Sequence, residues 1–185
     1  MRSLLASGTP GLASGFTSAA RARLRQTNAK ALPNSYTLFT RQSRDGKVVP
    51  TQNLNDILRR ARSLYGAGMG FASLGILASV VRATVGMQWD EEGDMADILV
   101  VIDADIGQAI QARNKLDRID CHAYELYFQS CKEEIDGGRI GDFTSAHEAV
   151  NDLRMAVNDS LADVESWGGE FPFERAVSSI EYWKI

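Results

Sequence analysis

Acidic residues are missing from the beginning of the sequence. The first is Asp45, and the stretch before it is rich in Ala, Ser, Gly, Leu and Arg. A basic, hydroxylated segment without acids is typical of mitochondrial or plastid targeting sequences, and this one lacks the compact apolar run of a secretory signal. We therefore expect residues 1–52 to form an irregular basic arm that includes a targeting segment. The alternative is a basic arm that is never cleaved.

Cysteine is also scarce. Cys121 and Cys131 are the only two, and they form no C-x-x-C pair of the zinc type. His122 lies beside Cys121, but consecutive residues of a helix point in different directions and no further ligand converges on them. The sequence predicts no catalytic residue, no cofactor and no metal site.

Charge is divided unevenly along the chain. Residues 1–62 hold eleven Lys or Arg and two acidic residues, whereas residues 88–185 hold twenty-two Asp or Glu and eight Lys or Arg. The net charges are about +9 and about −14 on the two sides of one hydrophobic segment. Such a separation is typical of a protein inserted across an energised membrane, in which the basic residues stay on the negative side.

The hydrophobic segment is predicted to be a transmembrane helix. Leu64 to Val81 spans eighteen residues without a charge, and extension to Val85 gives 22 residues. A helix of that length spans about 33 Å, which is enough for a bilayer. Basic and aromatic residues follow at both ends, where membrane-interface residues are expected. This interface set is Arg59, Arg60, Arg62, Arg82 and Trp89.

Small residues recur along the same segment at helical spacing. A stripe of this kind lets a second helix approach closely, so we expect it to pack against another transmembrane helix. The stripe contains Gly66, Gly68, Gly70, Ala72, Gly75 and Ser79.

The residues before the hydrophobic segment carry turn and cap signals. Asp45-Gly46 favours a tight turn between two short extended stretches. Asn53 or Asn55 is predicted to cap a proline-free helix that continues to Trp89.

The acidic half is predicted to be helical. Apolar residues from Met95 to Leu116 recur at helical spacing, and residues 117–135 continue in the same way. Ser145 and Glu148 match a capping box, which starts a helix that ends at Gly168-Gly169. Residues 117–135 and this helix are expected to form a small helical hairpin around residues 136–145, and the aromatic tail is expected to dock on the hairpin or on a neighbour.

One stretch of the acidic half has a second interpretation. Residues 98–102, ILVVI, could instead be a strand that ends in Asp103 and Asp105. A strand ending in D-x-D resembles the first motif of haloacid-dehalogenase-type phosphatases and the metal-binding motif of glycosyltransferases. The resemblance covers only LVVIDADIG, and it implies a divalent ion or a phosphate at the two carboxylates.

The nine residues between Cys121 and Cys131 resemble the C-x9-C element of mitochondrial intermembrane-space helical-hairpin proteins, several of which are accessory subunits of respiratory complexes. The match covers one of the two elements that those proteins carry, and residues 145–166 contain no cysteine. Two cysteines ten positions apart on one helix lie about 15 Å from each other, beyond the reach of a disulfide. We expect two buried or interfacial thiols.

Together these features predict a mostly α fold with a basic arm (1–52), an entry and transmembrane helix (53–89) and an acidic helical domain with an aromatic tail (90–185). The expected function is that of a non-catalytic accessory subunit of a respiratory complex in the mitochondrial inner membrane. The N-terminus would lie in the matrix and the acidic domain in the intermembrane space. The expected partners are other subunits, membrane lipid and a basic carrier such as cytochrome c, and not nucleic acid.

Two alternatives come from other classes of protein. The first is a soluble, all-helical interaction protein whose glycine-rich helix is the core of a bundle. The second is a small metal-dependent phosphotransfer enzyme built on Asp103 and Asp105. A virion or bacterial membrane component also fits the hydrophobic segment and the separation of charge.

Overall fold

The computed structural model describes the chain apart from residues 1–18, 20–31, 43–45, 68, 115–142 and 182–185. Contacts divide the chain into two units, Met1–Ala31 and Leu32–Ile185, and every element named below belongs to the second. Its described residues form a 3₁₀ turn, two short strands and five helices. The mostly helical character that the sequence predicts is confirmed in this part of the chain.

The first elements are a 3₁₀ turn, η1 (Ser35–Thr37), and an antiparallel pair, β1 (Phe39–Arg41) and β2 (Val48–Pro50). Thr40 is paired with Val49 at the centre of the two strands. Gly46 lies in the turn with a φ of 71°, a conformation that glycine adopts without strain. The predicted extended pair is confirmed.

Helix α3 (Gln52–Gly66) follows β2 almost at once. Its N-cap is Thr51, whose hydroxyl oxygen accepts a hydrogen bond from the Leu54 N–H and donates one to the Thr37 carbonyl. The predicted cap at Asn53 or Asn55 is wrong, because Thr51 satisfies the first turn and both asparagines lie inside the helix.

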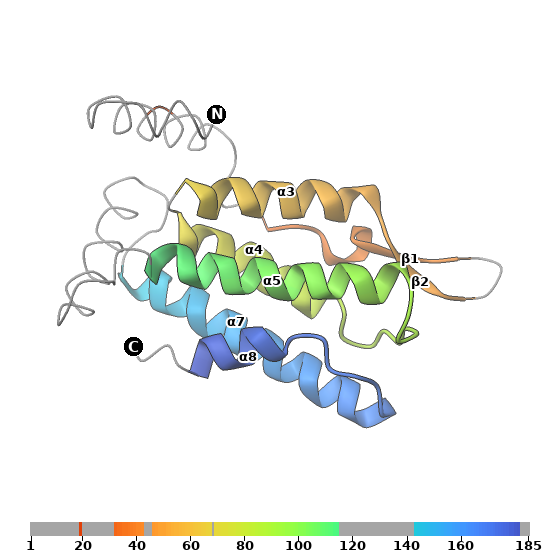
Figure 1. Cartoon of the computed structure of the whole chain (residues 1–185). Coiled ribbons are helices and arrows are strands. Elements are labelled where there is room, and N and C mark those ends of the chain that lie inside the picture. Colours follow the sequence, from red (N-terminus) through yellow and green to blue (C-terminus); the bar gives the residue numbers. More distant parts are fainter. Residues whose placement is uncertain (1–18, 20–31, 43–45, 68, 115–142, 182–185) are drawn as a thin grey trace. The chain divides into compact units, whose positions relative to one another are not determined.

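The predicted continuous helix from residue 53 to Trp89 is interrupted. Helix α3 ends at Gly66 and α4 (Gly70–Arg82) starts four positions later. The connection between them is only three residues long, 67–69. Figure 1 shows that α4 runs back alongside α3.

None of the helices in the described residues combines the length and the apolarity needed to cross a membrane. The transmembrane helix from Leu64 to Val85 is therefore a wrong prediction, and so is the single-pass localisation in the inner membrane. The apolar residues of this segment serve another purpose. Ten of the thirteen residues of α4 are buried, because α4 lies between other helices.

Helices α3, α5 (Asp94–Asn114) and α7 (Phe143–Trp167) enclose α4. Of these, α7 makes the most extensive contact with it. Helix α5 also packs on α3, so that α3, α4 and α5 contact one another. Leu74 and Leu77 of α4 are almost fully enclosed at the centre of this core.

The C-terminal helix α8 (Glu174–Glu181) closes the bundle. It packs mainly on α5 and less on α7. Phe173, which precedes it, is completely buried, so the prediction that the aromatic tail docks on the helices is confirmed for this residue. The end of α7 is also as predicted, with Gly168 at a φ of 75°, although α7 begins at Phe143, two residues before Ser145.

Candidate functional site

The two carboxylates of the predicted D-x-D motif lie on a helix, not at the end of a strand. Residues 94–114 form α5, so the strand interpretation of residues 98–102 is wrong. Side chains two positions apart on a helix point in different directions. Asp103 is directed to α8 and Asp105 to α3, and each already has a structural role.

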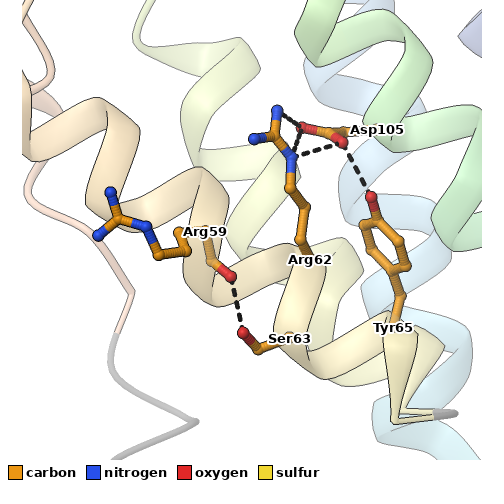
Figure 2. A network of polar contacts seen from close by, with 5 residues as sticks. All are labelled: Arg59, Arg62, Ser63, Tyr65 and Asp105. Carbon is orange, nitrogen blue, oxygen red and sulfur yellow. Dashed lines mark hydrogen bonds and ion pairs between the residues drawn. The ribbon is translucent and has the colours of Figure 1, made fainter. Parts of the chain in front are cut away.

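Asp105 joins α5 to α3 (Figure 2). Arg62 donates from Nε and from its Nη2 to the carboxylate at 3.0 and 2.8 Å, and the Tyr65 hydroxyl donates to the same carboxylate at 2.9 Å. Burial and the bond to Asp105 raise the pKa of Tyr65 to about 12. The same carboxylate raises the pKa of Arg62. Asp105 is therefore a charged tie between helices, with its acceptor positions in use.

Asp103 joins α5 to α8. Its Oδ1 accepts a hydrogen bond of 2.8 Å from the backbone N–H of Ala176, in the first turn of α8. A helix leaves its first N–H groups without partners, so a carboxylate at this end stabilises it. Burial raises the pKa of Asp103, against the lowering effect of the backbone N–H groups. Across the described residues, no group of three or more candidate ligands is placed to hold a metal ion.

The residues predicted at a membrane interface have partners within the protein. Arg82 donates two hydrogen bonds to the carboxylate of Asp152 on α7, and this interaction raises the pKa of Arg82. Arg59 pairs with Asp56 on the surface of α3. Burial lowers the pKa of Arg60. These arginines hold or cover helices of the bundle, and with the transmembrane helix overturned Arg82 is an ion-pair partner of α7.

The small-residue stripe brings two helices together at one position. A Cβ on Gly70 would lie 3.2 Å from the carbonyl oxygen of Ala109, so α4 and α5 approach closely there. A Cβ on Gly66 would meet nothing, and one on Gly75 would make ordinary contact with Leu32. The helix that packs closely on this segment belongs to the same chain.

Two further residues of the small-residue stripe, Ala72 and Ser79, lie within α4. Ser79 donates a hydrogen bond to the carbonyl of Gly75 within α4, and Ala72 is half-buried. Gly68, Cys121 and Cys131 lie outside the described residues, as does the predicted helix at 117–135.

A cleft of about 960 Å³ lies elsewhere on the protein, and we call it the tryptophan cleft. Three segments that are distant in the sequence form it: the β1–β2 hairpin, the connection from α4 to the start of α5, and the end of α7. Its lining includes the charged and aromatic side chains of Arg41, Lys47, Trp89, Glu92, Asp94 and Trp167.

Two tryptophans give this cleft its aromatic wall. The rings of Trp89 and Trp167 meet edge to face, with centroids 5.2 Å apart and planes at 83°. Both are half-buried. A Cβ on Gly169 would overlap the ring of Trp167, so glycine at this position leaves space for the indole. Among the described residues, the indole N–H of Trp167 is the only buried side-chain polar atom without a hydrogen-bond partner.

Polar contacts hold the three segments of the cleft in place. The N–H of Gly86 donates to the carboxylate of Asp163 on α7 at 3.0 Å. Lys47 of the hairpin forms an ion pair of 2.5 Å with Asp90 in the connection. Both side chains of this ion pair are exposed, so it adds little stability. It does place the charge of Lys47 next to the carboxylate of Asp90.

The charge in the cleft is negative. Asp90, Asp163, Glu92 and Asp94 line it, against Arg41 and Lys47. Glu92 and Asp94 are exposed and make no ion pair with any residue in the described part of the chain. The cleft therefore combines aromatic surface with carboxylates that face solvent.

Reasoning from the sequence identified Trp89 but assigned it to a membrane interface, and it did not connect Trp89 with Trp167. The available signal was a glycine close to each tryptophan in the sequence. Gly86 precedes Trp89 and Gly168 follows Trp167, and both have a positive φ that allows the chain to turn. In comparisons with known proteins, no family model, no curated protein and no solved structure matches this chain. Function is inferred from the site itself.

Proposed function

We propose that this chain is a non-catalytic accessory component of a multisubunit assembly and that it holds a protein partner in the tryptophan cleft. The observation that carries this proposal is the cleft itself, with two half-buried indoles on its wall and charged groups at its edge. Tryptophan is enriched among the residues that dominate binding energy at protein interfaces.

Several of the charged side chains that were candidates for catalysis or for a membrane interface hold the fold together, which supports the same function. Asp103, Asp105 and Arg82 each tie one helix of the bundle to another. A side chain that holds the fold together in this way is poorly placed to bind and release substrate. Membership of a respiratory complex stays a prediction, and anchoring by a membrane helix is no longer part of it.

Native-gel separation of a gentle extract tests the proposal. The full-length chain, carrying a tag and expressed in cells of its native source, should migrate in an assembly much larger than its own 20.3 kDa. Trp89→Ala should release it from that assembly, because the substitution removes part of the aromatic wall. Met155→Ala is the control, since Met155 is an exposed apolar residue of α7 outside the cleft.

Thermal unfolding of the purified Trp89→Ala variant must show that it is folded for the comparison to count. Migration of the unaltered chain as a free monomer would overturn the proposal. Retention of a folded Trp89→Ala variant in the assembly would do so too, because the cleft would then have no part in binding.

A further inference from the structure

We propose that the tryptophan cleft binds an extended segment of a partner protein through a Lys or Arg side chain. The cation lies against the indole of Trp89, with the carboxylates of Glu92 and Asp94 beside it. This inference rests on the proposed function, because it names the chemistry of the partner segment that the cleft accepts.

The size of the cleft suits a peptide. Pockets for drug-sized molecules range from about 300 to 1,000 Å³. At about 960 Å³ the cleft is at the upper end of that range, so one side chain would fill only part of it. Several consecutive residues of an extended segment can lie between the hairpin and the end of α7.

The charges of the cleft select a cation. Lys47 is already neutralised by Asp90, whereas Glu92 and Asp94 have no basic partner among the described residues. A partner carboxylate would meet these two groups and be repelled, and a Lys or Arg side chain would be attracted. Arg41, on the hairpin side, is left to pair with an acidic or carbonyl group further along the segment.

The aromatic wall strengthens this preference. A cation over the face of a tryptophan is attracted by the negative face of the ring, and tryptophan is the best of the aromatic residues for this contact. Trp89 and the two free carboxylates line one cleft, and all three come from the connection before α5 and its first residue. The proposal places one basic side chain against this indole and these carboxylates.

The indole of Trp167 provides a hydrogen-bond donor for the main chain of the bound segment. The N–H of Trp167 is buried without a hydrogen-bond partner in the described structure, and leaving such a donor unpaired costs about 1 to 3 kcal/mol. A main-chain carbonyl of the bound segment supplies an acceptor. The nitrogen has almost no exposed surface, so this hydrogen bond requires the ring to turn toward the segment.

Charge at longer range guides the encounter. Residues 88–185 carry a net charge of about −14 and include both free carboxylates. A field of this sign accelerates the association of a basic segment, and added salt weakens it. Binding in the cleft should therefore become weaker as the ionic strength rises.

Fluorescence anisotropy with a synthetic probe tests the proposal on the full-length protein. The probe is a labelled peptide in which lysine alternates with serine, and its matched control has norleucine in place of lysine. We expect the norleucine peptide to bind at least tenfold more weakly. The double variant Glu92→Gln, Asp94→Asn should lose about tenfold in affinity for the lysine peptide, because it keeps the shape of both side chains and removes their charge.

A matched variant separates a local site from net charge. Glu148→Gln, Glu181→Gln also removes two exposed carboxylates, but these lie on α7 and α8 outside the cleft. It should change the affinity by less than twofold. Equal losses in the two double variants would overturn the proposal, as would equal binding of the norleucine peptide. Free spermine binding as tightly as the peptide would show a small-amine site and overturn it as well.

The same variants distinguish this inference from the function on which it rests. Trp89→Ala alters the wall for any partner, whereas Glu92→Gln, Asp94→Asn removes only charge. If the first leaves the native assembly and the second stays in it, the function stands and the basic segment is wrong. If the unaltered chain enters no assembly, the function is wrong, and the peptide titration still decides what the cleft binds.

Discussion

Helices α4 and α5 are neighbours in the same bundle, but they are buried by different chemistry. Helix α4 is enclosed on nearly all sides by apolar residues, and its one charged residue, Arg82, lies at its end. Helix α5 buries two carboxylates, Asp103 and Asp105, and each meets a donor from a different helix. The comparison shows that a helix apolar on all sides indicates burial in protein as readily as burial in lipid.

The difference also separates two kinds of stabilisation. Burial of apolar surface on α4 is non-directional and depends on close packing. The carboxylates of α5 act through hydrogen bonds of defined geometry, so they fix where α3 and α8 lie relative to α5. Four substitution experiments test this contrast.

The largest effect is expected at the centre of α4. Leu77 has no exposed surface, so Leu77→Ala should lower the free energy of unfolding by about 3 kcal/mol through lost burial and the cavity left behind. Met155→Ala on the exposed face of α7 should change it by less than about 0.5 kcal/mol. Urea unfolding measures both values, and similar losses in the two variants would show that α4 is not the core.

The next effect concerns the tie between α5 and α3. Asp105→Ala removes the acceptor shared by Arg62 and Tyr65 and should cost about 2 kcal/mol, since the hydrogen bonds of both side chains to a buried carboxylate are lost. Arg62 is partly exposed and can regain water, which limits the loss. The double variant Arg62→Ala, Asp105→Ala should cost less than the sum of the single variants. Arg59→Ala, at an exposed pair, should have almost no effect, and additive costs at Arg62 and Asp105 would contradict the tie.

A smaller effect is expected where α5 meets α8. Asp103→Ala removes the acceptor of the Ala176 N–H and should cost about 1 kcal/mol, like the loss of a helix cap. Asp103→Asn keeps an acceptor oxygen and removes a buried charge, so it should be at least as stable as the unaltered protein at neutral pH. Hydrogen exchange of the amides of α8 should speed up in the alanine variant only. Faster exchange in both variants would mean that the charge itself is required.

The smallest effect is a dependence on pH from the same group. Burial raises the pKa of Asp103 in the folded protein above the ordinary value of 3.8, so the folded protein binds this proton more tightly than the unfolded chain does. Its contribution to stability is complete below pH 3.8 and is lost as the pH rises through the folded pKa. Unfolding curves measured over this range should show a steeper fall for the unaltered protein than for Asp103→Asn. If stability falls equally with pH in both proteins, Asp103 is not the group whose proton causes the dependence.

Several local elements could be predicted from the sequence because their causes are local. The turn at Gly46, the stop at Gly168 and the helical spacing of α5 each depend on residues that are close in the chain. The fate of the hydrophobic segment could not be predicted in this way, because a break of a few residues after Gly66 decides whether it forms one long helix or two antiparallel helices. Hydropathy over a window averages across such a break.

The candidate site was harder to predict than the fold. The cleft is lined by residues that are far apart in the sequence, such as Lys47, Trp89 and Trp167. It forms only when the hairpin, the connection before α5 and the end of α7 come together. The aspartates at 103 and 105 show the opposite case, because their spacing suggests a shared ligand while the helix directs them to different neighbours.

What the sequence determined by itself is the helical character, the main turns and the uneven distribution of charge, since these follow from residue types and short spacings. Tertiary structure alone decided that Leu64 to Val85 is divided between two helices packed against protein. It also decided that Arg62 and Arg82 pair with carboxylates of other helices, and that two indoles form one wall of a cleft. The physical reason is that burial and ion pairing depend on contacts between distant segments, and short-range sequence patterns do not record those contacts.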